Sequence, residues 1–516
     1  MSKMLDHFLV RAGLRLAEKS SGFRGKVREL VTASLKESYQ SLVADPSALN
    51  YQKVFGISVW PFLENLLLNK PHAAEKVIHF ALQWSHDMER RVSSRKRGFI
   101  APDTYVVEPT NACNLNCRGC YASSEHVGSE IPYEVLRQID DEMKEVGVTL
   151  TTISGGEPFM AEKKNSVITR LAEHNQKKND SAFLVYTNGT LIDEEIAKRL
   201  GDFGNIWPAI SIEGFAESTR RRRGDRIIDQ IRQAKDYLNK QGVMYGFSAT
   251  ATRLNAEEIA SDEFFAERMA EGDNFGWIFI YQPIGRSVEA DLMVTGEQRY
   301  HIGKKVMEMQ IENRAPLFLG DFWNYGPFVD GCIAAGTCYF HIMADGTISP
   351  CVFSPFGVSH LNEIESFSGL LGPTNGYRRK FKNIQDALTH QETLVFYREQ
   401  QAKIKDRFRP CVLIDHPDYA REIFTRKECF ETNNTPADYF RGRTADIIDQ
   451  RAKEWREVWS PKLREYAEGI VARKLEEEFG WAPQNKPMKG APTANRRMGE
   501  NLHGGEQWPY RGNMEN

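Results

Sequence analysis

The sequence lacks any long apolar run and has only eight cysteines among its 516 residues. No run of about 18 consecutive apolar residues occurs, so the sequence predicts no helix that spans a membrane. The first residues mix Asp6, His7 and Arg11 with apolar side chains, which argues against a cleavable signal peptide. We therefore expect a cytoplasmic protein, in which disulfides are rare and cysteines more often bind metal.

A strong excess of either charge is also missing. The net charge is -3 and 27% of the residues are charged, which is ordinary for a globular protein and gives no reason to expect a nucleic acid partner. The distribution is uneven, because residues 1–98 hold 16 Lys and Arg against 9 Asp and Glu. Such a basic segment is either a solvated helical face or a peripheral contact site for acidic partners or an anionic membrane surface.

The spacing of apolar residues changes along the chain. Between Leu5 and Leu16, apolar residues recur at steps of three and four, and further apolar stretches lie within residues 59–68 and 77–84. We therefore expect an N-terminal helical domain over residues 1–98.

Short apolar segments alternate with helical patterns from about residue 103 to 286. We expect strands at Thr104–Val107, Val148–Ile153, Ala182–Tyr186, Trp207–Ile212, Gly246–Thr250 and Gly276–Tyr281. We expect helices at Tyr133–Val146, Ser166–Gln176, Asp193–Leu200, Ile227–Lys240 and Ala256–Ala270. This order predicts parallel strands with right-handed crossovers. Periodicity alone does not decide between a partial barrel and an open sheet.

The remainder of the chain loses this repeat. Residues 311–430 are richer in Gly, Pro, Cys and aromatic residues, which suits a small domain held by metal, and residues 441–480 predict one long charged helix. After Pro483 the polar composition predicts disorder. The expected domains are 1–98 (helical), 99–310 (strand–helix repeat), 311–435 (cysteine-rich), 436–482 (C-terminal helix) and 483–516 (tail).

Three cysteines lie close together directly after the first expected strand. Cys113, Cys117 and Cys120 have the spacing C-x3-C-x2-C, and thiolates are the usual ligands of iron–sulfur clusters. A loop this short places three thiolates around one cubane cluster and leaves the fourth iron open to an exogenous ligand. The competing interpretations are buried free thiols or a zinc site, although structural zinc usually takes four ligands in two C-x2-C pairs.

This spacing, followed by the aromatic residue Tyr121, resembles the signature of the radical S-adenosylmethionine (radical SAM) superfamily. The resemblance covers roughly residues 103–430 and implies an α/β fold with a partial (β/α)6 TIM-like barrel. It implies an enzyme whose 4Fe–4S cluster binds S-adenosylmethionine at the open iron. After one electron from a flavodoxin- or ferredoxin-type reductant, such an enzyme cleaves this cofactor to a 5′-deoxyadenosyl radical that abstracts hydrogen from a substrate.

The turn after the second expected strand resembles a second motif of this family. Gly155, Gly156 and Glu157 stand where relatives bind the methionine amino group of the cofactor. Glycines let the backbone approach a ligand closely, and a carboxylate accepts hydrogen bonds from an ammonium group.

The ends of later strands resemble further cofactor contacts. Ser211, after the fourth strand, resembles the position that contacts ribose and methionine, and Ile284, after the sixth, lies where relatives hold adenine. Arg222 or Arg223 would pair with the methionine carboxylate. The alternative for these arginines is a solvated run of four basic residues.

A further group of cysteines follows the repeat. Cys332, Cys338 and Cys351 resemble the opening of a SPASM/twitch auxiliary-cluster domain, and with Cys411 they would ligate one further 4Fe–4S cluster. Cys429 resembles the last ligand of a second auxiliary cluster, but the C-x2-C-x5-C-x3-C block that would complete it is absent, so Cys429 stays unassigned. The cluster would transfer electrons, or this site is purely architectural or binds zinc.

One position departs from the family pattern. Relatives that mature sulfatases have an Asp base after the third auxiliary cysteine, and Val352 stands there in this chain, which argues against sulfatase maturation. Peptide-modifying relatives often carry a recognition domain with strands near the N-terminus, whereas residues 1–98 predict helices. A small-molecule or lipid substrate and a peptide substrate therefore stay open, as does a non-catalytic iron–sulfur electron carrier or regulator.

Two other features are interpreted as packing. His341, between Phe340 and Ile342, is expected to be a strand residue rather than a ligand. The aromatic run within residues 318–328 is expected to be core rather than a substrate-binding box.

Overall fold

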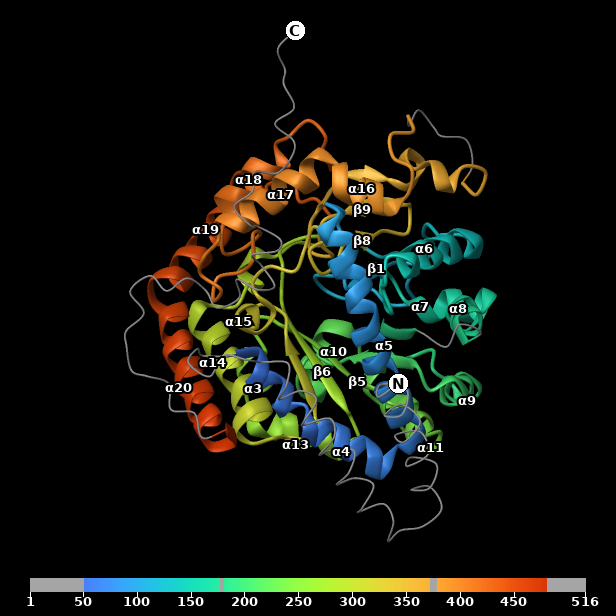
Figure 1. The fold of residues 1–516 in the computed structure, drawn as a ribbon. Helices are drawn as coiled ribbons and strands as arrows, with labels where there is room; N and C mark the ends of the chain where they lie inside the picture. Colours follow the sequence, from blue (N-terminus) through green and yellow to red (C-terminus); the bar gives the residue numbers. More distant parts are fainter. Residues whose placement is uncertain (1–50, 177–180, 372–377, 480–516) are drawn as a thin grey trace.

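The computed structural model describes residues 51–176, 181–371 and 378–479, and its centre is a sheet with strand order β11-β9-β8-β1-β2-β3-β4-β5-β6-β7 (Figure 1). The strands are β1 Thr104–Val107, β2 Leu150–Ile153, β3 Ala182–Thr187, β4 Ile206–Ser211, β5 Gly246–Ala251, β6 Phe275–Ile280, β7 Phe318–Asp321, β8 His341–Ile342, β9 Thr347–Ser349 and β11 Ser359–His360. All neighbours from β8 through β1 to β7 run parallel. Strands β9 and β11 add antiparallel pairings, and β10 (Phe356–Gly357) pairs separately with β12 (Phe430–Glu431).

The six predicted strands are confirmed as β1–β6, each within two residues of its expected bounds. Strands β7 and β8 extend the parallel array at its two ends. A strand at His341 was expected, but its pairing with β1 and the whole of β7 were not predicted. These two strands do not pair with each other, so the array is a partial barrel that stays open between them. The predicted α/β class and partial barrel are confirmed.

Helices connect the strands of the barrel. They are α6 Tyr133–Glu145, α7 Pro158–Asn165, α8 Val167–Gln176, α9 Glu194–Phe203, α10 Ala216–Arg223, α11 Ile227–Lys240, α12 Ala256–Ile259, α13 Asp262–Ala270 and α14 Gly296–Met307, which a π-helical turn at Glu308–Glu312 prolongs. The predicted single helix at 256–270 is wrong, since Ser261 interrupts it. The Ser261 side chain accepts a hydrogen bond from the N–H of Phe264 and so starts a new helix.

Alternate side chains of the strands face two different layers. Phe247 on β5 packs edge-to-face against Phe264 on α13, with ring centroids 5.2 Å apart, so this side of the sheet faces the crossover helices. Residues of the opposite parity, such as Leu184 and Trp207, form a second buried cluster on the inner face of the barrel.

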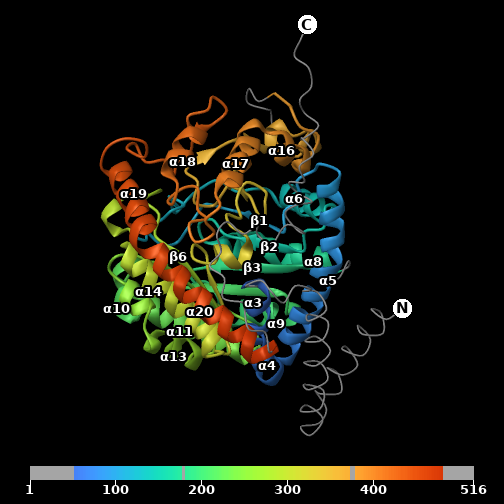
Figure 2. The ribbon, with the colours of Figure 1, turned by 60° about the vertical axis from the view of Figure 1, so that its left-hand side comes forward.

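The N-terminal helices α4 (Trp60–Asn69) and α5 (Pro71–Lys96) pack against this inner face, and α3 (Tyr51–Ser58) packs beside it, with the rings of Phe55 and Phe318 of β7 5.9 Å apart. Phe62 and Leu66 of α4 and Val77 of α5 share the cluster with Leu184 and Trp207. Figure 2 shows α5 running along one side of the molecule while α4 lies beneath the strands. The predicted helices are therefore part of the barrel core rather than a separate bundle.

The C-terminal part of the described chain is also helical. It comprises α15 Gly326–Val329, α16 Ile384–His390, α17 Glu392–Lys403, α18 Pro417–Phe424, α19 Arg443–Glu454 and α20 Ser460–Phe479. The predicted long helix exists as α19 and α20 joined by a π-helical turn at Trp455–Trp459, and it descends across α14 (Figure 2). Across the three described segments, no helix is long and apolar enough to cross a membrane. The expectations for residues 5–16 and 483–516 lie outside the described residues.

Candidate active site

The cysteine loop follows β1 at the carboxyl ends of the strands. Cys113 is buried, Cys117 and Cys120 are half-buried, and all three are free thiols. The N–H of Leu115 donates to the Cys113 sulfur over 3.5 Å, and the Asn188 side-chain amide lies 3.9 Å from the same sulfur. Burial raises the pKa of Cys113 to about 12, and the nearby Glu157, Cys117 and Cys120 add to this rise. Because ligation needs thiolates, metal binding in this loop would release protons.

The donor set of this loop fits an iron–sulfur cluster in kind and number. The thiols of Cys117 and Cys120 lie near enough to Cys113 to raise its pKa, and thiolates are the ligands such clusters use. Within the described part of the chain, no three His, Cys, Asp or Glu side chains are close enough together to hold a single metal ion. A cluster is a larger body than one ion, so its sulfur ligands stand further apart.

Two glycine turns hold the cysteine loop against the barrel. A Cβ atom added to Gly156 would lie 2.1 Å from the carbonyl oxygen of Ala112, so only glycine allows this approach. The N–H of Gly156 donates to Thr110 O and that of Glu157 to Ala112 O, over 3.0 and 2.8 Å. After β6, Gly285 at φ +79° would place a Cβ only 2.3 Å from Cys120 O.

Glu157 has a structural role that the sequence did not show. Its carboxylate is fully buried and accepts hydrogen bonds from Phe159 N–H and the Thr187 hydroxyl, over 3.0 and 2.7 Å. It also accepts from Asn188 N–H over 2.7 Å. Burial raises the pKa of Glu157, although these hydrogen bonds and Arg223 offset part of the rise. The carboxylate therefore fixes the turn that places Asn188 beside Cys113. The backbone of the glycine turn, rather than the Glu157 side chain, lies against the cysteine loop.

Arg222 and Arg223 are folded into the site rather than solvated. Both guanidinium groups form ion pairs with Glu213, whose side chain is 1% exposed at the end of β4. The competing interpretation holds for Arg221, which is exposed, and for Arg220, whose side chain is 41% exposed. Glu213 was not predicted as a site residue, and the signal available was an acid at a strand end followed by paired arginines.

The other predicted cofactor contacts lie around the same loop. Ser211 is half-buried at the end of β4, opposite Ser248 of β5. The half-buried ring of Tyr121 packs against Phe353, with centroids 5.8 Å apart. Ile284 is 1% exposed and belongs to the hydrophobic core.

The inner face of the barrel is partly exposed near the carboxyl ends of the strands. Tyr186, Ser248, Thr250 and Phe279 are half-buried there, whereas their neighbours of opposite parity are buried. All four side chains are uncharged. This inner face therefore suits an apolar or neutral group beside the cysteine loop.

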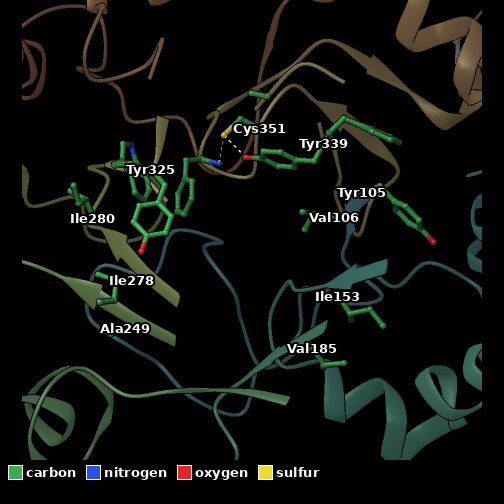
Figure 3. Packing of buried hydrophobic residues seen from close by; sticks show 14 of the residues in the cluster. Tyr105, Val106, Ile153, Val185, Ala249, Ile278, Ile280, Tyr325, Tyr339 and Cys351 are labelled. Atoms are coloured by element: carbon green, nitrogen blue, oxygen red, sulfur yellow. Dashed lines mark hydrogen bonds between the residues drawn. The ribbon is translucent and has the colours of Figure 1, made fainter. Parts of the chain in front are cut away.

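The aromatic run after β7 adds a wall to this inner face. Trp323 packs 4.8 Å from Phe353, and Phe322 packs 5.4 Å from Phe279, so the run is mostly core as predicted. The Trp323 Nε1 and Tyr325 hydroxyl groups are buried without a hydrogen-bond partner among the described residues. Figure 3 shows Tyr325 above the strand residues Ile278 and Ala249.

Three of the four predicted auxiliary cysteines are neighbours. Burial, Asp415 and the thiols of Cys332 and Cys351 raise the pKa of Cys411. The Tyr339 hydroxyl lies 2.8 Å from the Cys351 sulfur, and Phe353 N–H donates to that sulfur over 3.4 Å (Figure 3).

Cys338 and Cys429 lie at the margin of this group. Burial raises the pKa of Cys338, as do Asp103 and, last, Cys332, whereas Arg95 lowers it. The Cys429 sulfur donates to Ile423 O over 3.5 Å and lies 3.9 Å from the Thr393 hydroxyl. No other cysteine influences the pKa of Cys429, which burial raises to about 11.

His341 lies in β8, as expected. Its Nε2 is 3.1 Å from Glu108 Oε1, and both side chains are buried. Its Nδ1 has no hydrogen-bond partner among the described residues.

Comparison with known proteins agrees with this geometry. The family model described as "Radical SAM superfamily" matches residues 107–260. Fe-coproporphyrin III synthase of Methanosarcina barkeri is 29% identical over 153 residues, which are 29% of this chain and 37% of that protein. Mycofactocin maturase MftC of Mycolicibacterium smegmatis is 30% identical over 215 residues, which are 41% of this chain and 53% of that protein. The matches thus span about half or less of these two relatives.

One solved structure with the cofactor is also similar. Streptococcus suis SuiB bound to S-adenosylmethionine gives a TM-score of 0.43 at 18% identity, over 50% of this chain and 62% of that chain.

Proposed function

Because residues 107–260 form a radical SAM domain, we propose that this protein is an enzyme that uses S-adenosylmethionine to abstract hydrogen from a substrate. The observation that carries the proposal is the single loop with Cys113, Cys117 and Cys120, held between two glycine turns at the carboxyl ends of parallel strands. Ligand sites of parallel α/β folds lie at these strand ends.

The residues of the site would bind and orient the reacting groups. A 4Fe–4S cluster on Cys113, Cys117 and Cys120, with S-adenosylmethionine bound, would supply the 5′-deoxyadenosyl radical after reduction by a flavodoxin- or ferredoxin-type protein. The Gly155–Gly156 backbone, Ser211 and the region of Ile284 would contact the cofactor. Tyr121 and the aromatic wall would exclude water from the reacting atoms.

The substrate would lie on the half-buried inner face of the barrel. Its lining by Tyr186, Ser248, Thr250 and Phe279 favours an uncharged reacting group. A small molecule or lipid and a peptide both satisfy this condition. The relatives are named for an iron–coproporphyrin and for mycofactocin, and each matches too little of its length to transfer its substrate.

The second group of cysteines would hold an auxiliary cluster. Cys332 and Cys351 lie near enough to Cys411 to raise its pKa, and Cys332 likewise raises the pKa of Cys338. Such a cluster would accept the electron left on a substrate radical, and Cys429 stays outside it.

Anaerobic reconstitution with iron and sulfide, followed by dithionite and S-adenosylmethionine, tests the proposal. We expect wild-type protein to form 5′-deoxyadenosine and the Cys117→Ala variant to form none, because this variant removes one of three ligands. Cys429→Ala is the control and should keep the wild-type rate. Zinc or no metal at the loop would contradict the proposal, and a cluster that yields no 5′-deoxyadenosine would instead indicate an electron carrier.

A further inference from the structure

One buried carboxylate and two half-buried guanidinium groups form a unit beside the cysteine loop. Glu213 lies at the end of β4, and Arg222 and Arg223 occupy the last turn of α10. Arg222 Nη1 and Arg223 Nε donate to Glu213 Oε1 over 2.6 and 2.7 Å. The second carboxylate oxygen, Oε2, accepts from Thr250 N–H over 3.1 Å, which anchors the carboxylate to β5.

Arg222 reaches the backbone of the cysteine loop. Its Nε donates to Arg118 O over 3.2 Å and its Nη2 to Gly119 O over 3.3 Å. In return, the N–H of Arg118 donates to Arg222 O over 3.0 Å. Arg118 and Gly119 are the two residues between Cys117 and Cys120, so Arg222 fixes the spacing of these thiols.

Arg223 reaches a sulfur atom. Its Nη1 lies 3.9 Å from Cys117 Sγ, within hydrogen-bond range for sulfur. The Arg223 side chain is 13% exposed, so little water competes for this contact. The unit of one carboxylate and two guanidinium groups carries a net charge of about +1.

We propose that Glu213, Arg222 and Arg223 act as a clamp that positions the cysteine loop and raises the reduction potential of the cluster through the Arg223–Cys117 contact. This proposal rests on the proposed function and adds to it. A hydrogen bond and a positive charge at a cysteine ligand stabilise the reduced, more negative cluster. The clamp engages both arginines that the sequence suggested as partners of the methionine carboxylate, and that pairing stays a prediction.

A redox titration of the reconstituted cluster, followed by electron paramagnetic resonance, tests the clamp. We expect Arg223→Met to lower the midpoint potential and Arg223→Lys to recover part of the loss. Glu213→Gln should shift the potential in the opposite direction, because it removes a negative charge while keeping a hydrogen-bond acceptor. Arg221→Met, on the exposed side of the same helix, is the matched control and should keep the wild-type potential.

The result that overturns the clamp is a wild-type potential in cluster-loaded Arg223→Met and Glu213→Gln. If Arg223→Met loads no iron, Arg223→Lys and Glu213→Gln still decide the question through the sign of their shifts. Failure of the proposed function has a different signature, because wild-type protein would then hold no cluster or form no 5′-deoxyadenosine.

Discussion

At the residue scale, a few close contacts determine the geometry of the site. Any Cβ atom at Gly156 would clash with the Ala112 carbonyl, and the Glu157 carboxylate accepts a hydrogen bond that holds the turn with Asn188. The motif Gly-Gly-Glu therefore has a structural role of its own, whether or not it binds a ligand. Substitutions here should affect folding and cluster binding together.

Gly156→Ala tests the close approach at this joint. A methyl group 2.1 Å from a backbone oxygen forces the turn away from the loop, and we expect a loss of roughly 1–3 kcal/mol in unfolding free energy. The cluster content should fall as well. Gly469→Ala is the control, since nothing lies within 4 Å of its added carbon and helix α20 should gain about 0.5–1 kcal/mol. Thermal and urea unfolding of the apo proteins measure the stability of both variants. A Gly156→Ala variant as stable as the wild type would contradict the close approach.

The Glu213 ion pairs predict a dependence of stability on pH. Burial alone would raise the pKa of Glu213, but Arg222 and Arg223 outweigh it and hold the pKa below its usual value of 4.5. A lowered folded-state pKa stabilises the fold above the unfolded-state pKa, and this contribution is lost as the pH falls through the folded-state pKa. At pH 7, Glu213→Gln should cost on the order of 3 kcal/mol in the apo protein.

Urea unfolding of both proteins at a series of pH values provides the measurement. The stability difference between wild type and Glu213→Gln should shrink as the pH falls below about 4.5. Glu217→Gln on the exposed face of α10 should show no such trend, because its pair with Arg220 is long at 3.8 Å and solvated. A difference that stays constant down to acid pH would rule out the proposed ion-pair contribution.

Regular periodicity made the elements of the barrel predictable. Strands β1–β6 and helix α11 appear close to their expected bounds, because buried parallel strands and amphipathic helices leave strong local patterns. The two-residue strand β8 leaves no such pattern, since its pairing with β1 joins residues far apart in the chain. The contacts of the clamp were not predicted either, because the sequence of α10 is a charged run with no apolar face.

The N-terminal helices offer a test of packing at the level of one element. Leu66 of α4 is fully buried in the cluster with Leu184 and Trp207, so Leu66→Ala should cost roughly 2–5 kcal/mol. Leu68 of the same helix is 50% exposed, and Leu68→Ala should change stability by less than about 0.5 kcal/mol. Equal effects in chemical denaturation would contradict the contact between α4 and the inner face.

At the scale of the whole molecule, the N-terminal and C-terminal helices enclose one barrel. Helices α4 and α5 cover the inner face near the amino ends of the strands, and α19–α20 cross α14 (Figure 2). In the described part of the predicted helical domain 1–98, helices α3–α5 contribute side chains to the barrel core.

Two truncations separate a structural role from a membrane role. A chain starting at residue 99 should lose the cooperative unfolding transition, since Leu184 and Trp207 would lose their cover. A chain starting at Tyr51 should keep that transition. If the basic segment 1–98 contacts membranes, the full chain should sediment with phosphatidylglycerol vesicles. The chain from Tyr51, which keeps half of the Lys and Arg residues of that segment, should sediment less. A full chain that stays in the supernatant would remove the membrane hypothesis.

The pairing of β1 with β8 joins the two groups of thiols through the backbone. The loop with Cys113 follows β1, and the N–H groups of Asp103 and Thr104, at the start of β1, both donate to Cys338 O over 2.7 and 3.0 Å. Cys351 follows β9, which pairs with β8. If both groups of thiols hold clusters, this ladder would set the distance that an electron tunnels between them.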